Sequence, residues 1–537
     1  LYLFKNKINH EEFEYLTRWQ DKFAVNFHNK YKIFNKENSY EKKRLLNFYS
    51  LMQSMNEEIY FKNNLLSEDF LEKYFDIDAF SKMFVSSLAW GESGFHSLYL
   101  NNARFYINPY DLKIFPIPAD YDFIFLQKYE LKSIQKSVSD LPYFYKPLIN
   151  SKKFQKMYLK SLLEFENQLQ NIFNDIEILC EKYNRICNDL FFKNKLEANI
   201  KKLKEYNLDI FKFEKKTVNN SIQIKNFEKN DFENLFNDFM HARIYNNGIL
   251  KIKNLTPFKI KINSLEIIND GIKKNLNLDL KPSKNKINQI HTNLKINLES
   301  NSEVKIKFNL KNSEIKKDYI LIVENSQNLN NKFINEENLE KILGKDVYLN
   351  NKTIVFKESD HLINSFLELP ENYNLKIMPG ARLIFAENSG ILLKNAFIDI
   401  SGTNEKPIKL MSQKNKWKGI HLIGNILNKK KSTINYTEIY DLDFFSYKNY
   451  FLTGGINIYN SEIEILNSKF SNTKAEDSLN LINSDFIIEN CYFVNNSSDA
   501  IDSDYSNGKI LNSKFVKING DAVDTSGSNV YIEKLVL

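Results

Sequence analysis

Apolar residues recur at helical spacing in two stretches of the N-terminal half of the chain. They fall three and four residues apart between Ser67 and Leu88, and again from Lys152 to Tyr206, where there is no Gly or Pro. Between these stretches, Arg104 to Ile117 has the pattern of a strand, a turn and a second strand. We therefore predict a helix, then a β-hairpin, then a helical hairpin or bundle.

Beyond Asn247 and Gly248 the apolar residues alternate with polar ones. The alternation runs through Ile249–Lys253, Phe258–Ile262 and Val304–Phe308, and turn-forming Asn, Ser and Pro residues separate these runs. A period of two with polar residues facing outward is typical of antiparallel sheets with one solvated face. We expect a small antiparallel β-sandwich over residues 246–325.

The C-terminal block contains an internal repeat of about 22 residues. The repeated positions are Asp477, Asp499 and Asp521; Asn480, Asp502 and Asp524; Ile488, Ile510 and Ile532; Phe470, Phe493 and Phe515; Asn467, Asn490 and Asn512; and Ser468, Cys491 and Ser513. Twenty-two residues at ~3.3 Å each suffice for three short strands and three turns around a triangular coil. The Leu-x-x-Leu-x-Leu pattern of leucine-rich repeats is missing. The block predicts a right-handed parallel β-helix.

Three upstream segments support this interpretation. Ile377–Phe385, Gly402–Ile408 and Trp417–Ile420 resemble the opening coils of secreted right-handed β-helix proteins. The resemblance covers roughly Leu349 to Leu537. It implies that the protein is extracellular or attached to a cell surface.

The predicted fold is therefore multidomain. It consists of an α+β domain with a helical bundle at 1–245, the β-sandwich at 246–325, a linker at 326–344 and the β-helix at 345–537. The chain opens at Leu1 without an initiator Met and ends at Leu537 directly after an alternating strand. We expect the natural protein to continue beyond both ends, because an open last coil is normally capped.

Charge and composition exclude some partners. The net charge of +7 is small for 537 residues, and Lys and Glu alternate as on a solvated surface, so nucleic-acid binding gains no support. No stretch approaches the ~20 apolar residues of a membrane span. Cys180, Cys187 and Cys491 do not form a disulfide framework, and we expect Cys491 to be a small residue in a stack. The histidines lack the spacing of zinc ligands.

Polar residues that could bind a metal ion flank the predicted hairpin. His96 and Asn102 precede it, Asn108–Asp111 supplies its turn, and Asp120 and Asp122 follow it. Phosphoryl transfer needs Mg²⁺ held by oxygen ligands near the phosphates, and protein kinases use an Asn and an Asp that flank a β-hairpin. The alternative is that these residues form turns and structural hydrogen bonds.

This segment resembles the spore coat protein H (CotH-like) family of atypical kinases. The matching residues are His96, Asn102, Arg104, Phe105, Tyr106, Asn108, Pro109, Pro116, Asp120 and Asp122. The resemblance extends over about residues 1–325. It implies a kinase that uses ATP and Mg²⁺ to phosphorylate Ser or Thr of secreted proteins, with Asn102 binding the cofactor and Asp120 both binding it and acting in catalysis.

In the same resemblance, Asn102, Asp120 and Asp122 are the Mg²⁺ ligands. Ser97 stands where the family has its catalytic Asp, so Glu92 and His96 are the candidate bases. The Lys-bearing strand that grips the phosphates is expected upstream of Leu1.

Three consecutive β-helix coils carry an acidic or amide pair three residues apart. The candidate residues are Asp499, Asp502, Asp521 and Asp524, preceded by Asp477 and Asn480. Carboxylates stacked about 4.8 Å apart repel one another, which favours a cation such as Ca²⁺. Paired acids also occur in β-helix glycosidases, and Asp and Asn are common in turns, so catalysis and turn formation are alternatives.

We thus predict a CotH-like kinase fused to a β-helix that binds a protein substrate or a surface polymer. The alternatives are a non-catalytic adhesion scaffold with a degenerate kinase-like domain and a β-helix carbohydrate-active enzyme.

Overall fold

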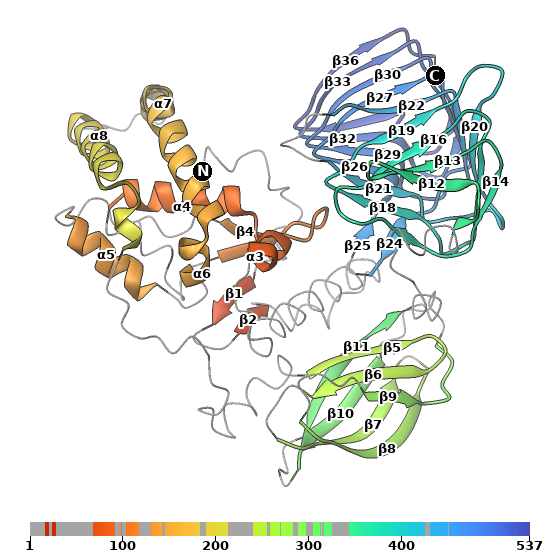
Figure 1. The fold of residues 1–537 in the computed structure, drawn as a ribbon, viewed down its shortest axis with the longest axis horizontal. Coiled ribbons are helices and arrows are strands. Elements are labelled where there is room, and N and C mark those ends of the chain that lie inside the picture. The colour runs from red at the N-terminus through yellow and green to blue at the C-terminus, as the bar shows by residue number, and fades with distance from the viewer. Residues whose placement is uncertain are drawn as a thin grey trace. The chain divides into compact units, whose positions relative to one another are not determined.

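The structure is a computed structural model of the chain. It describes residues 17–20, 24–27, 68–91, 98, 104–117, 130–141, 145–182, 189–212, 240–254, 258–268, 270–282, 288–296, 304–311, 313, 316–324, 343–424, 430–448 and 450–536. The chain divides into two units (Figure 1). The first consists of residues 1–108, 112–244 and 248–323, and the second of residues 109–111, 245–247 and 324–537.

The predicted hairpin is present in the first unit. Strands β3 (Arg104–Ile107) and β4 (Ile114–Ile117) pair antiparallel, with Arg104 opposite Ile117. The turn closes through the Asn108 N–H, which donates to the Lys113 carbonyl over 2.9 Å. Strands β1 (Thr17–Gln20) and β2 (Ala24–Phe27) extend this ribbon to four strands.

The helix predicted between Ser67 and Leu88 is two helices, α3 (Glu68–Tyr74) and α4 (Ile77–Ala89). Asp76 interrupts it, because its carboxylate accepts a hydrogen bond from the Ala79 N–H over 2.9 Å and caps α4. The preceding Phe75 forms a β-bridge with Ile114 of β4. The apolar spacing continued across the break, which is why periodicity alone did not locate it.

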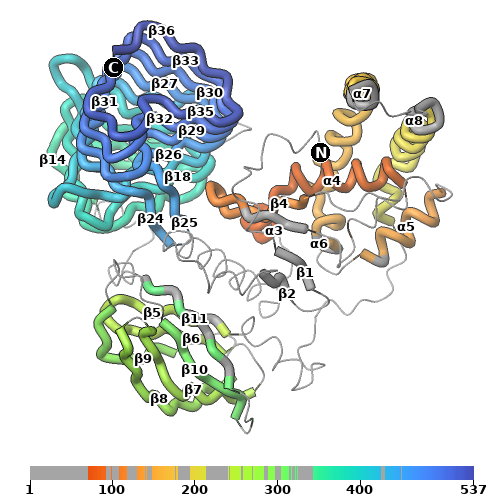
Figure 2. Tube along the Cα trace, turned by 180° about the vertical axis from the view of Figure 1, so that it is seen from behind, coloured from red at the N-terminus to blue at the C-terminus, as the bar shows by residue number. Residues whose placement is uncertain are grey.

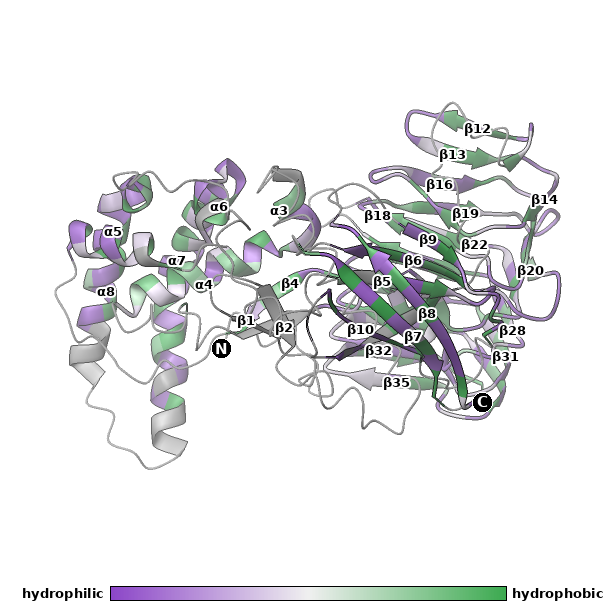
Figure 3. Cartoon of the chain, turned by 90° about the horizontal axis from the view of Figure 1, so that it is seen from below, coloured by the Kyte–Doolittle hydropathy of each residue, from purple (hydrophilic) through white to green (hydrophobic). Residues whose placement is uncertain are grey.

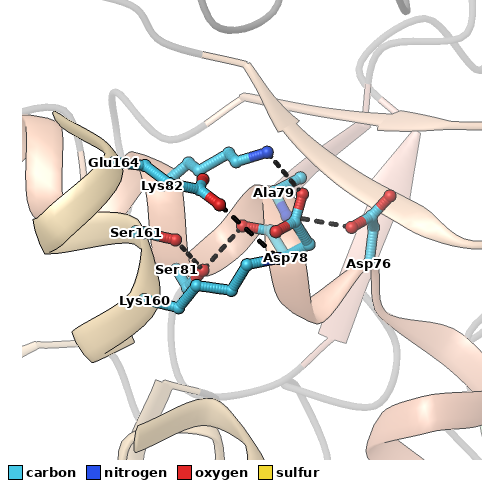
Figure 4. A network of polar contacts seen from close by, with 8 residues as sticks. All are labelled: Asp76, Asp78, Ala79, Ser81, Lys82, Lys160, Ser161 and Glu164. Atoms are coloured by element: carbon cyan, nitrogen blue, oxygen red, sulfur yellow. Dashed lines mark hydrogen bonds and ion pairs between the residues drawn. The ribbon is translucent and has the colours of Figure 1, made fainter. Parts of the chain in front are cut away.

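The remaining helices include the predicted helical hairpin. Their bounds are α5 (Leu131–Asp140), α6 (Tyr145–Asn150), α7 (Lys152–Lys182), α8 (Asp189–Tyr206) and the 3₁₀ helix η4 (Asn207–Phe211). Helices α4 and α7 meet at two buried serines, Ser81 and Ser161, whose Oγ atoms lie 2.8 Å apart (Figure 4). Small residues at this crossing let the helices approach closely. The described helices include none with the length and apolar character of a membrane span.

The alternating segment forms an antiparallel sheet of seven strands in the order β8-β7-β10-β11-β5-β6-β9. The strands are β5 (Met240–Tyr245), β6 (Ile249–Asn254), β7 (Ile260–Ile267), β8 (Ile272–Leu280), β9 (Asn288–His291), β10 (Val304–Leu310) and β11 (Lys317–Glu324). Every second residue of β10 is buried, and hydrophobic and hydrophilic residues alternate along β7 (Figure 3). The prediction of antiparallel strands is confirmed, although the sheet begins at Met240.

The second unit contains a parallel β-helix of about eight turns, as predicted. Its coils stack in chain order (Figure 2) and form three sheets. Sheet I consists of β12 (Val347–Asn350), β13 (Thr353–Phe356), β16 (Asn374–Ile377), β19 (Ile398–Ser401), β22 (Ser432–Asn435), β27 (Glu462–Leu466), β30 (Asp485–Glu489), β33 (Asn507–Leu511) and β36 (Asn529–Glu533). Sheet II consists of β14 (Asp360–Ile363), β17 (Arg382–Phe385), β20 (Ile408–Ser412), β23 (Thr437–Tyr440), β28 (Lys469–Ser471), β31 (Tyr492–Asn496) and β34 (Lys514–Ile518). Sheet III consists of β15 (Leu367–Glu368), β18 (Ile391–Lys394), β21 (Ile420–Ile423), β26 (Gly454–Tyr459), β29 (Asp477–Ile482), β32 (Asp499–Asp504) and β35 (Val523–Ser526).

The coil length differs from the predicted 22 residues, because a turn takes about 23. Asp502 follows its partner Asn480 by 22 residues, but Asn480 follows Asn457 by 23. His421 pairs with Asn457, 36 residues later, because an insertion between their strands carries the short hairpin β24 (Phe445–Tyr447) and β25 (Tyr450–Leu452).

Repeated residues fill the interior of the β-helix. Phe493 stacks between Phe470 and Phe515, with ring centroids 4.7 and 5.1 Å away. The Cys491 thiol is free and buried, and its backbone N–H donates to the Ser513 hydroxyl over 3.2 Å. Cys491 is thus the small stacked residue that the repeat predicted. Trp417 is also buried and stacks on Phe385 with centroids 4.0 Å apart.

Candidate binding face on the β-helix

Acidic and amide residues occupy equivalent positions on successive strands of sheet III. In the parallel register, Asn457 pairs with Asn480, Asn480 with Asp502, and Asp502 with Asp524. We call the position that each strand contributes to this series a rung. Buried residues stand on either side of a rung, such as Leu479 and Leu481 or Ile501 and Ser503. Because successive side chains of a strand point to opposite faces, the rung side chains lie on the outer surface of the strands. We call these four residues the outer row.

A second row runs beside the first. Asp477 pairs with Asp499, and Oδ1 of Asp499 accepts a hydrogen bond from the Asp521 N–H over 2.7 Å. One coil earlier this position is Gly454, where a Cβ would lie only 2.8 Å from Oδ1 of Asn457. The two rows together, Asn457, Asn480, Asp502, Asp524, Asp477, Asp499 and Asp521, are called the acidic face below.

The alternative that these acids serve as turn residues is not supported by their backbone. None of the five described aspartates of the acidic face has a positive φ, and four of them belong to strands β29, β32 and β35. The left-handed turn positions are taken by asparagines, such as Asn467, Asn490 and Asn512 with φ of 47°, 55° and 48°. Turn chemistry therefore explains the repeated asparagines but not the repeated aspartates.

The buried end of the acidic face joins two carboxylates through one amide. Nδ2 of Asn480 lies 3.3 Å from Oδ2 of Asp477 and 3.3 Å from Oδ2 of Asp502, and it donates to both. Thr453 Oγ1 also donates to Asp477 over 3.3 Å. These contacts bring carboxylates from neighbouring coils together around a single side chain.

Burial and mutual repulsion raise the pKa of both carboxyls. Loss of solvent is the larger cause for Asp502, and the charges of Asp477, Asp504, Asp524 and Asp499 add to it, so its pKa rises to about 9. Loss of solvent and then the Glu476 charge raise the pKa of Asp477 to about 7. Holding these groups ionised therefore costs free energy in the ligand-free protein.

The same region has more hydrogen-bond acceptors than donors. Oδ1 of Asn480 and Oδ1 of Asn457 are buried and have no hydrogen-bond partner. The amide nitrogen of Asn457 is already used, because it donates to the Gly454 carbonyl over 2.7 Å. A ligand that supplies positive charge or hydrogen-bond donors would satisfy these groups.

Exposure increases along the face. Asp477 and Asn480 are only 2% and 4% exposed. Asp499 and Asp502 are half-buried, and Asp521 and Asp524 are exposed. The face is therefore closed toward the earlier coils and partly open to solvent at Asp499 and Asp502, although β35 stacks on their strand.

The β24–β25 hairpin covers sheet III beyond the buried end. His421, the partner of Asn457, lies against Phe445 and Tyr450, with ring centroids 5.3 and 5.4 Å away. Burial lowers the pKa of His421 to about 4, so the ring is neutral at physiological pH. Lys418 and Asp443 form a buried ion pair of 2.8 Å that anchors the start of this insertion.

The predicted calcium ligands Asp499, Asp502, Asp521 and Asp524 do share this face. Within the described ranges, however, no three His, Cys, Asp or Glu side chains form a group that could hold a metal ion. A calcium site made of these four carboxylates alone stays a prediction.

The predicted kinase residues Glu92, His96, Asn102, Asp120 and Asp122 lie outside the described residues. The described hairpin has its open end at the Arg104–Ile117 pair, two residues after Asn102 and three residues before Asp120 in the sequence. Their proposed roles stay predictions.

Sequence reasoning missed Asn457 as a member of the outer row and His421 as its partner one coil earlier. The 36-residue interval between them hides their equivalence, because the insertion breaks the count. The interval of 23 between Asn457 and Asn480 was the available signal. Comparison with protein-family models, curated proteins and solved structures found no match to this chain.

Proposed function

We propose that the β-helix is a binding module that holds a hydroxyl-rich polymer, such as a neutral polysaccharide, along the solvent-accessible part of its acidic face. The observation that carries this proposal is the in-register row of Asn457, Asn480, Asp502 and Asp524 on four successive strands. The fold itself does not require polar residues there, because the equivalent rung two coils before Asn457 is Leu392.

The chemistry of the face suits sugar hydroxyls. Carboxylate oxygens accept hydrogen bonds from O–H groups, and the half-buried Asp499 and Asp502 and the exposed Asp521 and Asp524 carry such oxygens. Parallel strands repeat the rung about every 4.8 Å, which favours a ligand that also repeats. A row of carboxylates repels polyanions, so we expect neutral polymers to bind better than uronate polymers.

A retention experiment tests the binding proposal. The full chain is passed over immobilised neutral and uronate polysaccharides, and the retained fraction is compared with that of Asp502→Leu and of the matched control Asp485→Leu. Asp485 begins β30 of sheet I and is exposed. Retention by a neutral polymer that Asp502→Leu loses and Asp485→Leu keeps supports the proposal. It fails if neutral polymers are not retained, or if Asp502→Leu binds like the parent.

The same samples separate binding from cleavage. Release of reducing ends by the parent, lost in Asp502→Asn, would assign the β-helix to the carbohydrate-active enzymes instead of to binding modules.

For the N-terminal part we propose the activity that its resemblance implies, a protein kinase that transfers phosphate from ATP to Ser or Thr of an extracellular or surface protein. Mg²⁺ would be held by Asn102, Asp120 and Asp122, with Glu92 or His96 as base. The proposal is supported by the β3–β4 hairpin, whose open end at Arg104 and Ile117 adjoins these residues in sequence.

Nucleotide-dependent stability tests the kinase proposal. Addition of ATP and Mg²⁺ should raise the melting temperature of the parent and of the control Asp209→Ala, but not of Asp120→Ala. The control residue lies in η4 and is distant from the hairpin in sequence. No shift in the parent would favour the alternative of a scaffold with a degenerate kinase-like domain.

A further inference from the structure

The antiparallel sheet of β5 to β11 holds the positive charge of the chain. Residues 240–324 contain 15 Lys and one Arg against eight Asp and Glu, which gives this segment a net charge of +8. The whole chain carries +7, so a net charge of −1 is left for all the other residues. A domain with such a surplus of positive charge attracts negatively charged partners.

Part of this charge lies on the solvent-facing side of the sheet, around Glu266 of β7. Along β10 the buried residues alternate with Lys305 and Lys307, so these two lysines lie on the outer surface. Glu266 stands opposite Lys305 on one side and Lys273 of β8 on the other. It forms ion pairs with Lys273 and Lys307, over 3.0 and 3.1 Å, and Asp318 of β11 stands opposite Lys307. Three lysines therefore surround two carboxylates.

A second group of lysines adjoins the first along the same strands. Asp279 of β8 stands opposite Lys261 of β7 and forms an ion pair of 2.6 Å with Lys311. The hydrogen bond from Lys311 lowers the pKa of Asp279, and the charges of Lys261 and Lys259 lower it further. We call the two groups together the basic face. It consists of the lysines Lys259, Lys261, Lys273, Lys305, Lys307 and Lys311 and the carboxylates Glu266, Asp279 and Asp318.

The turn between β7 and β8 exposes two isoleucines beside the basic face. Ile268 and Ile272 flank this turn, and they are 44% and 41% exposed. The Gly271 N–H closes the turn by donating to the Ile268 carbonyl over 3.2 Å. A Cβ added at Gly271 would meet no atom within 4 Å, so the turn projects into open space. Single exposed apolar residues are common, but two at one projecting turn next to Lys273 indicate an interaction site.

We propose that the basic face and the β7–β8 turn dock on an anionic lipid membrane, with Ile268 and Ile272 inserted among the headgroups. Membrane-surface proteins combine shallow insertion of apolar side chains with attraction of lysines to anionic lipids. The exposed Asp270 in the same turn weakens this attraction, and the net charge of +8 outweighs it. A soluble polyanion would engage the lysines but give the two isoleucines no partner. The inference depends neither on polymer binding by the β-helix nor on phosphoryl transfer.

Sedimentation of the full chain with lipid vesicles tests the proposal. Vesicles of phosphatidylcholine alone are compared with vesicles of equal parts phosphatidylcholine and phosphatidylserine. We expect the parent to bind the anionic vesicles and to be released as NaCl is added, because salt screens the lysine charges. Ile268→Ser with Ile272→Ser, and Lys273→Gln with Lys307→Gln, should each weaken this binding at least about tenfold, since one lysine near an anionic surface contributes roughly fivefold.

Matched substitutions in the β-helix serve as controls. They are Leu362→Ser, at a residue that is 60% exposed, and Lys509→Gln with Lys514→Gln, at two exposed lysines. Both controls should bind the anionic vesicles like the parent. Far-ultraviolet circular dichroism verifies that each variant is folded. If the lysine variant does not fold, the isoleucine variant decides, because its two side chains lie at the tip of a turn.

Three results would overturn the proposal. They are no binding of the anionic vesicles by the parent, equal binding to both kinds of vesicle, and unchanged binding by the folded isoleucine variant. Retention of the parent on an immobilised uronate polymer, lost in the lysine variant but kept in the isoleucine variant and without binding to vesicles, would assign the basic face to a soluble polyanion instead.

Discussion

Asp502 lies directly across the parallel ladder from Asn480, and the Asn480 amide donates to its carboxylate over 3.3 Å. This contact joins two coils on the outer surface of sheet III. It also places a carboxyl where burial raises its pKa to about 9. A carboxyl group that has lost solvent in this way contributes little to the free energy of folding at neutral pH, so its presence calls for a functional explanation.

The phenylalanine stack should be the main local source of stability in the C-terminal coils. Phe493 is fully buried between two parallel rings, and Phe493→Ala removes its contacts with both. We expect a loss of about 3–5 kcal/mol in the free energy of unfolding, and a much smaller loss for Phe493→Leu. Urea unfolding followed by circular dichroism measures both. Equal losses for the two variants would contradict the stacking account.

The buried ion pair should hold the β24–β25 insertion in place. Lys418 and Asp443 have side chains only 11% and 9% exposed, and Nζ of Lys418 also lies 3.8 Å from the centre of the Phe444 ring. Lys418→Met leaves the carboxylate buried without its partner, which costs about 3–5 kcal/mol.

Removal of both charges, in Lys418→Met with Asp443→Leu, should recover much of that loss. Hydrogen exchange of peptides covering Phe444 to Leu452 reports the local stability. If the single and the double variant exchange equally fast, the charges do not anchor the insertion.

His421 should make the β-helix sensitive to acid. Burial lowers its pKa to about 4 in the folded protein, against about 6.5 when unfolded. The unfolded chain therefore binds a proton first as the pH falls. Stability is full above about pH 6.5 and declines by about 3 kcal/mol by pH 4.

His421→Asn introduces the residue found on the next rung, Asn457, and should remove this part of the pH dependence. The exposed His291 provides the control, since His291→Asn should leave the dependence unchanged. Melting temperatures between pH 7 and pH 4 decide the matter. A parallel decline in the parent and in His421→Asn would show that another group is responsible.

Much of the β-helix could be predicted from the sequence because its last coils repeat without insertions. Phe470, Phe493 and Phe515 recur because each coil needs the same inward ring, and Asn467 and Asn490 recur because each turn needs a left-handed residue. The earlier coils vary in length, because insertions such as β24–β25 occur in the turns between strands and do not change the strand register. Their repeat is therefore harder to see in the sequence.

The candidate site could be predicted only in part. The spacing identified Asp499, Asp502, Asp521 and Asp524, but it did not distinguish strand aspartates from turn aspartates, because both repeat once per coil. The contacts that join Asp477, Asn480 and Asp502 depend on which side chains face outward. Strict alternation along β29 would place Asp477 and Asn480, three residues apart, on opposite faces of the strand. His421 could not be assigned to a coil from the sequence, because the insertion between it and Asn457 interrupts the repeat.

The central claim is that the acidic face is retained for ligand binding and not for folding. The most direct test is the local unfolding free energy of Asp502→Leu, obtained from hydrogen exchange of peptides covering β29 and β32 in EDTA and without polymer. Leucine already occupies an equivalent rung at Leu392, where it is fully buried. We predict that Asp502→Leu is as stable as the parent or up to about 4 kcal/mol more stable. A loss of 2 kcal/mol or more, on the order of a lost buried hydrogen bond with its desolvation cost, would contradict the claim and make the ladder a structural element.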